Sequence, residues 1–552
     1  MRNDCWQLQP GSSLLRPKIL GADALERYPF VIGSPYPNVR PSEASPLFVA
    51  LLGYGLQTAI ILQGEMKQAG YRFDSLGVGI LPALRRDTPA EQIQPAYCYT
   101  VLLKIGAVAF ETVYSASTKV IMNYLPKLFS HLMLSLVCCA TLAAQTASTQ
   151  KSSPLTAATP ASVGMSAERL ARIDTMLNGA VAGGQVPGAV ALVARNGKIV
   201  YHKAFGEADA AGKELEKDAI FRIASQTKAI TATAVMMLWE QGLFQLDDPI
   251  SRYLPEFGEA QVLDTLYEDG TYDTRPAASQ ITIRHLLTHT SGLGYGVIDG
   301  DPRFRKMYAD AGVTDLFTTE EVTIGESVAK LAALPLHHDP GTAYVYSEGL
   351  DVLGYFIEVM SGEPLDEYFR KHIFEPLGME DTWFYLPQDK HDRLVAIQRP
   401  TDDGWENYPV TFYDPDYPKA GAGTFFSGGA GLSSTAEDYA AFLQMYLNGG
   451  ELNGVRLLSR TTIKSIMAHQ LGDLWNPGQY YGLAFGVVDA EGQARGGQGS
   501  QGTFTWGGYF NTQYFADPQE QLIGILMKQT QGTSRDQTAW KFKILVGQAV
   551  DD

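Results

Sequence analysis

Cysteine is scarce in this sequence and absent from most of it. The 552 residues contain four cysteines, Cys5, Cys98, Cys138 and Cys139, and none follows Gln145. A disulfide framework and a cysteine nucleophile are therefore excluded from the larger part of the chain. The nine histidines form no HExxH pattern and no other metal-ligand spacing. We therefore predict no metal and no cofactor.

Basic charge is also in deficit. Lysine and arginine together number 43 against 60 aspartates and glutamates, which gives a formal net charge of −17. Nucleic-acid phosphates are bound by basic surfaces that release counterions, so we expect no nucleic-acid partner. Hydrophobic residues make up 45% of the chain, as in ordinary globular proteins. The length is sufficient for two or more domains.

The first 121 residues give no clear prediction of fold. Residues 45–63 are uncharged and approach the length that spans a membrane, but their glycines, glutamines and proline weaken that interpretation. A buried segment or a non-native upstream translation fits this composition better. We treat residues 1–121 as an upstream segment of unknown nature that need not belong to the working protein.

Residues 122–147 have the layout of a secretory signal peptide, with Met122, Lys127, an apolar run over 132–144 and small residues. Because signal peptides act at an N-terminus, we hypothesise that the natural start is at or near Met122; a plain buried helix is the alternative. The protein would then be exported or periplasmic, and otherwise cytoplasmic. Residues 148–161 follow, and their serine, threonine, alanine and proline content is typical of a linker.

Residues 162–552 are predicted to form one folded region of the α/β class. Two early strands, 188–194 and 198–205, flank Asn196-Gly197, the strongest short signal for a hairpin. Further strands are expected near the end, at 502–508, 512–516 and 522–528. Helical periodicity falls between these two groups, at 229–241, 283–287, 350–360 and 436–447.

This order of elements predicts an antiparallel sheet flanked by helices, with an inserted, mostly helical lobe. The sheet lobe would comprise residues 162–224 and 425–552. The helical lobe would comprise residues 225–424 between them. We expect no stable membrane span in the region from 162 to 552, because its apolar runs are short and punctuated by charged and turn residues.

Ser225 and Lys228 are the strongest candidates for chemistry. They open the helix predicted to end near Gly242, and their spacing places both side chains on one face. A serine hydroxyl needs an adjacent base to act as a nucleophile, and a neutral lysine can serve as one. A plain helix N-cap is the alternative role for Ser225. The same SxxK pattern also occurs at 148–151, so the pattern alone is not specific.

A catalytic triad with histidine is disfavoured, because no GxSxG motif occurs in the chain. Tyr346 stands just before the predicted helix at 350–360 and is available as a different helper, although a tyrosine in such a place is more often a packing residue. His285 and His289 are spaced four apart without a third ligand nearby, so a structural role at a helix end is predicted for them.

Three motifs in fixed order now identify a family resemblance. Ser225-Gln226-Thr227-Lys228, Tyr346-Ser347 and Trp506-Gly507-Gly508 occur in the order seen in class C β-lactamases, D-aminopeptidases and family VIII esterases. The resemblance covers essentially all of residues 160–552, and it implies the fold of β-lactamases and penicillin-binding proteins. It also implies that residues 162–552 are the catalytic domain of a serine hydrolase.

The resemblance also implies a role for each motif residue. Ser225 would be acylated, Lys228 would take its proton, and Tyr346 would share in the proton transfer. The backbone N–H groups of Ser225 and Tyr509 would form the oxyanion hole. The glycines Gly507 and Gly508 would allow the backbone to approach the acyl group.

Two departures from the β-lactamase pattern bear on the substrate. Trp506 replaces the lysine of Lys-Thr-Gly, and Glu348 replaces the amide of Tyr-x-Asn. Losing a cation and gaining an anion disfavours anionic β-lactams, while the indole offers apolar area to an uncharged group. Trp506, Gly507, Gly508 and Glu348 are therefore predicted to bind substrate.

The sequence thus predicts a serine carboxylesterase acting on uncharged small-molecule esters, with room for weak β-lactam hydrolysis. A β-lactamase, a D-aminopeptidase or an acyl transferase using the same residues is the alternative. A catalytically inactive binding protein is a further alternative, which the presence of Ser225, Lys228 and Tyr346 disfavours.

Overall fold

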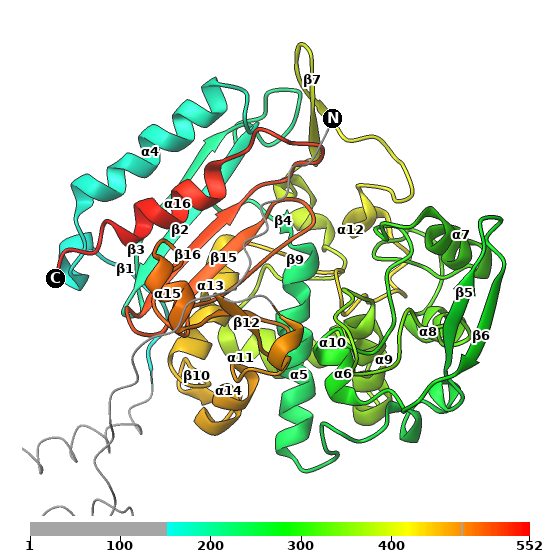
Figure 1. The fold of residues 1–552 in the computed structure, drawn as a ribbon. Coiled ribbons are helices and arrows are strands. Elements are labelled where there is room, and N and C mark those ends of the chain that lie inside the picture. Colours follow the sequence, from blue (N-terminus) through cyan, green and yellow to red (C-terminus); the bar gives the residue numbers. More distant parts are fainter. Residues whose placement is uncertain (1–151, 476–477) are drawn as a thin grey trace, which may run out of the picture. The chain divides into compact units, whose positions relative to one another are not determined.

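The computed structural model describes residues 152–475 and 478–552 (Figure 1). The predictions for 1–121 and 122–147 lie outside the described residues. The described part of the predicted linker is not all extended chain, because Thr156–Ala157 joins the sheet as strand β1 and Pro160–Val163 forms a short 3₁₀ helix. Within the described residues, no helix combines the length and apolarity needed to cross a membrane.

A single eight-stranded sheet forms the centre of the structure, in the order β1-β3-β2-β16-β15-β14-β13-β12 (Figure 1). Every neighbouring pair is antiparallel except β1 with β3. The strands after β1 are β2 (Gly188–Arg195), β3 (Lys198–Gly206), β12 (Gln479–Tyr481), β13 (Gly486–Val488), β14 (Phe504–Gly507), β15 (Gln513–Asp517) and β16 (Leu522–Met527). The predicted Asn196-Gly197 hairpin is confirmed, with φ of 52° and 72° at its two residues.

Helices cover both faces of this sheet. On one side α4 (Ala167–Ala182) and α16 (Thr538–Gly547) pack together and contact the strands, and on the other lies α13 (Ala436–Leu447) (Figure 1). The central strand β2 alternates between the two cores, with Ala191 and Val193 facing α4 and α16 and with Val190 and Leu192 facing the larger core. Burial on both faces explains why its sequence is continuously apolar.

The inserted lobe is mostly helical, as predicted. Its helices are α5 (Thr227–Glu240), α6 (Ile283–Leu287), α7 (Pro302–Ala311), α8 (Ile324–Ala332), α9 (Gly349–Ser361), α10 (Leu365–Phe369), α11 (Glu375–Leu377) and α12 (Tyr417–Ala420). Two hairpins in it were not predicted: β5 (Gln261–Leu266) with β6 (Tyr272–Pro276), and β7 (Gln398–Thr401) with β8 (Gly404–Asn407). Short helices α14 (Arg460–Ile466) and α15 (Ala490–Arg495) follow α13.

The two lobes share one large hydrophobic core. Residues of β2, α5, α9 and α13 all belong to it. The two-residue strands β4 (Phe221–Arg222) and β9 (Ser433–Ser434) pair with each other close to the predicted junctions at 224 and 425. This common core makes one compact unit of the described residues. The lobe boundaries themselves stay a prediction.

One buried carboxyl in this core has a measurable consequence for stability. Asp438 on α13 accepts hydrogen bonds from Asp381 N and Thr382 Oγ1, both at 2.8 Å, and burial raises its pKa to about 7. The folded state therefore favours the neutral form of Asp438. The stabilisation that this form gives to the folded state is lost as the pH rises from about 4 through about 7. Between pH 5 and 8 the free energy of unfolding of the wild type should fall, and in Asp438→Asn it should fall by up to roughly 3 kcal/mol less. Urea titrations at several pH values measure this difference. An unchanged pH dependence would contradict this prediction.

Candidate active site

Ser225 lies in a short 3₁₀ turn, Ala224–Gln226, between strand β4 and helix α5. Ser225 is partly exposed, whereas its neighbours Ala224 and Gln226 in the turn are buried. Ala224 adopts φ of 43°, a strained conformation for a residue with a side chain, which is typical of functional turns. Ser225 is not the N-cap of α5, because that position belongs to Gln226 and receives no side-chain hydrogen bond. The alternative role of Ser225 as a simple cap is therefore wrong.

Lys228 follows in the first turn of α5 and is completely buried. Its Nζ lies 3.3 Å from Ser225 Oγ, 2.9 Å from Tyr295 Oη and 2.8 Å from the carbonyl oxygen of Gly429. These three oxygens fix the amine beside the serine. The geometry matches the predicted contact of Lys228 with the hydroxyl of Ser225.

Tyr346 stands over the amine of Lys228. The distance from Lys228 Nζ to the centre of its ring is 4.7 Å. The buried ring of His289 lies 4.5 Å from that of Tyr346, and its Nδ1 accepts the backbone N–H of Ser347 at 3.1 Å. Burial, with Lys228 nearby, lowers the pKa of His289 well below its usual value, so this imidazole is neutral. His289 thus supports Tyr346 by packing, in agreement with the structural role predicted for it.

His285 also has a local structural role, in the capping box of α6 with Thr282. Among the described residues, no group of three or more histidine, cysteine, aspartate or glutamate side chains is arranged to hold a metal ion. The HxxxH spacing of His285 and His289 therefore does not correspond to a metal-ligand cluster in the described part of the chain.

Strand β14 brings the third motif next to the turn that holds Ser225. A Cβ atom on Gly508 would lie 2.2 Å from Thr512 Oγ1 and 2.5 Å from the carbonyl oxygen of Ile223. Only glycine permits this approach. Within the described residues, neither the backbone N–H of Ser225 nor that of Tyr509 donates a hydrogen bond. Both groups are thus available to the oxygen of a substrate.

Several aromatic rings pack together beside Tyr346. Trp506 lies with its ring centre 6.1 Å from that of Tyr346 and 5.3 Å from that of Tyr481. Tyr481 in turn contacts Tyr344 and Trp475 at 5.7 Å and 5.2 Å. We call these five residues the aromatic wall. The sequence singled out only Trp506 and Tyr346, although the position of Tyr344, two residues before Tyr346, was a usable signal.

Glu348 differs from its predicted role as an anion in the site. It is only 3% exposed, at the start of α9, and its Oε1 has no hydrogen-bond partner among the described residues. Burial, with the carboxyls of Asp315 and Asp351 nearby, raises the pKa of Glu348 well above its usual value. The neutral acid is therefore favoured, and the negative charge expected from the sequence is not. Direct contact of Glu348 with substrate stays a prediction.

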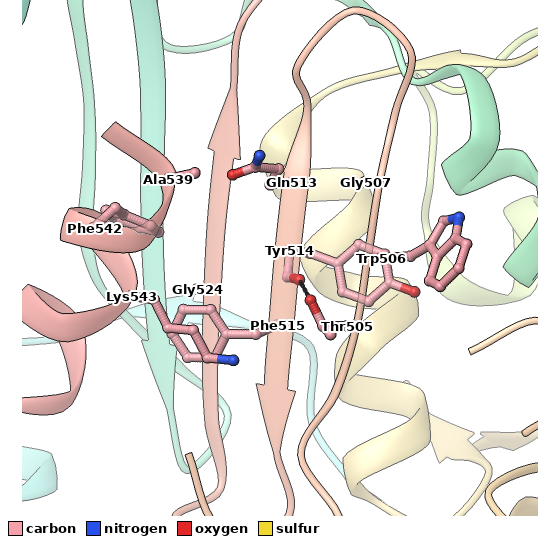
Figure 2. Close-up of a pocket in the computed structure, with 10 residues that line it drawn as sticks. All are labelled: Thr505, Trp506, Gly507, Gln513, Tyr514, Phe515, Gly524, Ala539, Phe542 and Lys543. Atoms are coloured by element: carbon pink, nitrogen blue, oxygen red, sulfur yellow. Dashed lines mark hydrogen bonds between the residues drawn. The ribbon is translucent and has the colours of Figure 1, made fainter. Parts of the chain in front are cut away.

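A cavity of about 220 Å³ lies between the strands β14 and β15 and helix α16 (Figure 2). Gln513, Phe515, Phe542 and Lys543 line it, and the side chain of Trp506 points away from them (Figure 2). Trp506 and Gly507 of the third motif also belong to its lining, whereas Ser225 and Lys228 do not. The cavity therefore adjoins the strand of the third motif without containing the nucleophile or its base.

The structure also brings together residues that the sequence did not assign. Tyr295 and Gly429 hold Lys228 although they are 67 and 201 positions away from it in the chain. Asp351 on α9 accepts hydrogen bonds from Ser427 Oγ and Gly429 N. Nothing local in the sequence indicated the function of Ser427 or Gly429.

Comparison with known proteins gives consistent relatives. The family model described as Beta-lactamase matches residues 173–548. Esterase EstB of Burkholderia gladioli is 32% identical over 382 residues, which is 65% of this chain and 90% of EstB. The lovastatin esterase of Penicillium rubens is 30% identical over 379 residues, which is 64% of this chain and 91% of that enzyme.

The solved structures agree. The structure of "EstCE1, a hydrolase with promiscuous acyltransferase activity" has 28% sequence identity and a TM-score of 0.58, and the match covers 70% of this chain and 99% of EstCE1. The family model alone covers more than half of the chain. The chain therefore belongs to the β-lactamase family of serine hydrolases, with family VIII-type ester hydrolases among its relatives.

Proposed function

We propose that this protein is a serine carboxylesterase that cleaves uncharged esters through an acyl-enzyme on Ser225. The geometry around Lys228 carries the proposal. A neutral amine has two N–H groups and one lone pair in a roughly tetrahedral arrangement. With the N–H groups directed at Tyr295 Oη and Gly429 O, the remaining direction faces Ser225 Oγ at 3.3 Å. Lys228 is thus oriented to accept the serine proton.

In acylation, Ser225 Oγ attacks the ester carbonyl carbon while its proton passes to Lys228 Nζ. The negative oxygen of the tetrahedral intermediate accepts hydrogen bonds from the backbone N–H groups of Ser225 and Tyr509. The intermediate then collapses, and the bond to the alcohol oxygen breaks. Tyr346, which lies over Lys228, relays the proton to the leaving alkoxide.

Deacylation reverses the direction of proton transfer. A water molecule attacks the acyl carbon and gives its proton to the Tyr346–Lys228 pair. The ester bond to Ser225 breaks, the serine oxygen recovers a proton, and the carboxylic acid leaves. Both half-reactions use the same two oxyanion donors, so no further group is needed to complete the cycle.

The choice of an ester over a β-lactam rests on Trp506. Where β-lactamases have the lysine of Lys-Thr-Gly, this chain presents an indole that is part of the aromatic wall. An apolar surface without a cation favours an uncharged alcohol or acyl group over a carboxylate. Burial raises the pKa of Glu348, so repulsion by its charge does not contribute to this preference.

Acyl transfer is the second candidate function. It uses the same acyl-enzyme, with an alcohol in place of water as the acceptor. The relative EstCE1 is described as a hydrolase with promiscuous acyltransferase activity, which favours this candidate. Adding a short alcohol to the assay and measuring the new ester beside the free acid separates transfer from hydrolysis.

The proposal predicts rapid turnover of p-nitrophenyl butyrate, slow turnover of nitrocefin and loss of both activities in Ser225→Ala. The physical reason is that both substrates require the same acylation. Initial rates with both substrates, measured side by side on wild type and variant, test it. Ester turnover that persists in Ser225→Ala would refute the nucleophile. Rapid nitrocefin turnover with slow ester turnover would instead favour a β-lactamase.

A further inference from the structure

The carbonyl that holds Lys228 is itself fixed by a buried carboxyl. Asp351 on α9 is 3% exposed. Its Oδ1 accepts a hydrogen bond from Ser427 Oγ at 2.5 Å and another from Gly429 N at 3.1 Å. The same Gly429 accepts Lys228 Nζ at its carbonyl oxygen, at 2.8 Å. One carboxyl oxygen therefore anchors the peptide segment that orients the base.

The packing around residues 427–429 leaves little room for movement. A Cβ atom on Gly429 would lie 2.2 Å from Asp351 Oδ2 and 3.0 Å from Tyr295 Oη. One on Gly428 would lie 2.4 Å from the carbonyl oxygen of Leu350. The carbonyl of Gly428 also accepts Thr231 Oγ1 at 2.6 Å. The segment is thus pressed against α9 on one side and held by α5 on the other.

Several titratable groups lie near Asp351. Lys228 comes from α5, Tyr295 and Asp315 come from loops of the helical lobe, and Glu348 lies one turn earlier at the start of α9. Burial raises the pKa of Asp351 above its usual value, although Lys228 and the hydrogen bonds from Ser427 and Gly429 act in the opposite direction.

We propose that Asp351 is a positioning residue for ester cleavage, fixing residues 427–429 so that Gly429 O directs Lys228 toward Ser225. This inference rests on the proposed function of Ser225 and Lys228. Asp351 does not touch the reacting atoms. It acts through one peptide group and one hydroxyl, which explains why two adjacent glycines and a serine precede Ala430 in this chain.

Asp351→Ala tests the anchoring. It removes the acceptor of both hydrogen bonds, so kcat for p-nitrophenyl butyrate should fall on the order of 10²-fold, as expected when a catalytic group is misplaced. KM should change by less than about twofold, since the substrate contacts remain. Asp438→Ala is the matched control, because Asp438 is also a buried carboxyl with two hydrogen-bond donors, Asp381 N and Thr382 Oγ1. It should lose similar stability and keep its kcat.

Asp351→Asn tests whether the hydrogen bonds alone are sufficient, because it replaces the carboxyl and keeps an acceptor oxygen. The amide oxygen can accept both donors, so kcat at the optimum should stay within about threefold of wild type. A loss of kcat in Asp351→Asn as large as that in Asp351→Ala would overturn the anchoring, because the asparagine variant keeps the acceptor of both hydrogen bonds.

A folded Asp351→Ala protein with wild-type kcat, or with a change in KM alone, overturns the anchoring. So does an equal loss of kcat in Asp438→Ala. If Asp351→Ala does not fold, Ser427→Ala replaces it, and a kcat unchanged within error overturns the anchoring there. Ester turnover that persists in Ser225→Ala overturns the proposed function itself, whereas an inactive Ser225→Ala beside a normal Asp351→Ala overturns this inference alone.

Discussion

Replacing Lys228 by methionine should lower kcat/KM for p-nitrophenyl butyrate on the order of 10⁴-fold, the upper end of what a general base contributes. Methionine matches the length of the lysine stem, so the packing of α5 is preserved. It removes the amine that contacts Ser225 Oγ, Tyr295 Oη and Gly429 O together. Stopped-flow measurement of the first turnover should show that acylation is the step that slows.

Lys528→Met is the matched control for this variant. Lys528 is also buried, 1% exposed, and it pairs with Asp536 and Thr538. Its replacement leaves a carboxylate without its partner and should destabilise the fold, yet it should leave kcat close to wild type. A Lys228→Met enzyme that acylates at a rate near wild type would contradict the role of Lys228 as base.

Gly508→Ala should also abolish most of the activity. The new Cβ would overlap Thr512 Oγ1 and the carbonyl oxygen of Ile223, at 2.2 Å and 2.5 Å. The oxygen of Ile223 belongs to the backbone two residues before Ser225 and cannot give way easily. The end of strand β14 therefore has to move, and the N–H of Tyr509 moves with it. Loss of one oxyanion donor lowers kcat by roughly 10²–10³-fold. Steady-state kinetics with p-nitrophenyl butyrate give this value directly.

Gly179→Ala provides the comparison. Gly179 lies in helix α4, and a Cβ atom there would meet no other heavy atom within 4 Å. Alanine should stabilise the helix by up to about 1 kcal/mol and leave kcat unchanged. A Gly508→Ala enzyme as active as Gly179→Ala would show that the oxyanion donors do not depend on this close approach.

Local signals in the sequence predicted the main elements because those signals act over a few residues. Asn196-Gly197 gave the β2–β3 hairpin, and helix α13 occupies the residues expected, 436–447. Strands β1, β12 and β13 were not predicted as such, because two or three residues are too few to show alternation. They form by pairing with longer neighbours, as Gly486 does with Thr505. Such strands are products of the sheet rather than of their own sequence.

For the candidate site, too, the sequence predicted the contacts between residues close in the chain but not those between distant ones. The spacing of Ser225 and Lys228 already placed one side chain beside the other, and the structure has them 3.3 Å apart. Tyr295, Gly429 and Asp351 reach the same point from distant parts of the chain, and no periodicity relates them. Glu348 shows the opposite error, since its chemical type was visible but its burial, which decides its charge, was not.

The pairing of β2 with β16 has a consequence for how the chain can fold during its synthesis. Six register pairs, from Leu522 with Arg195 to Met527 with Val190, join segments more than 300 residues apart. Until β16 has left the ribosome, the β2–β3 hairpin keeps an open, apolar edge in the nascent chain. Such an edge invites pairing with other chains, and closing so long a loop slows folding. Expression yield should therefore depend strongly on temperature and on chaperones that shield this edge.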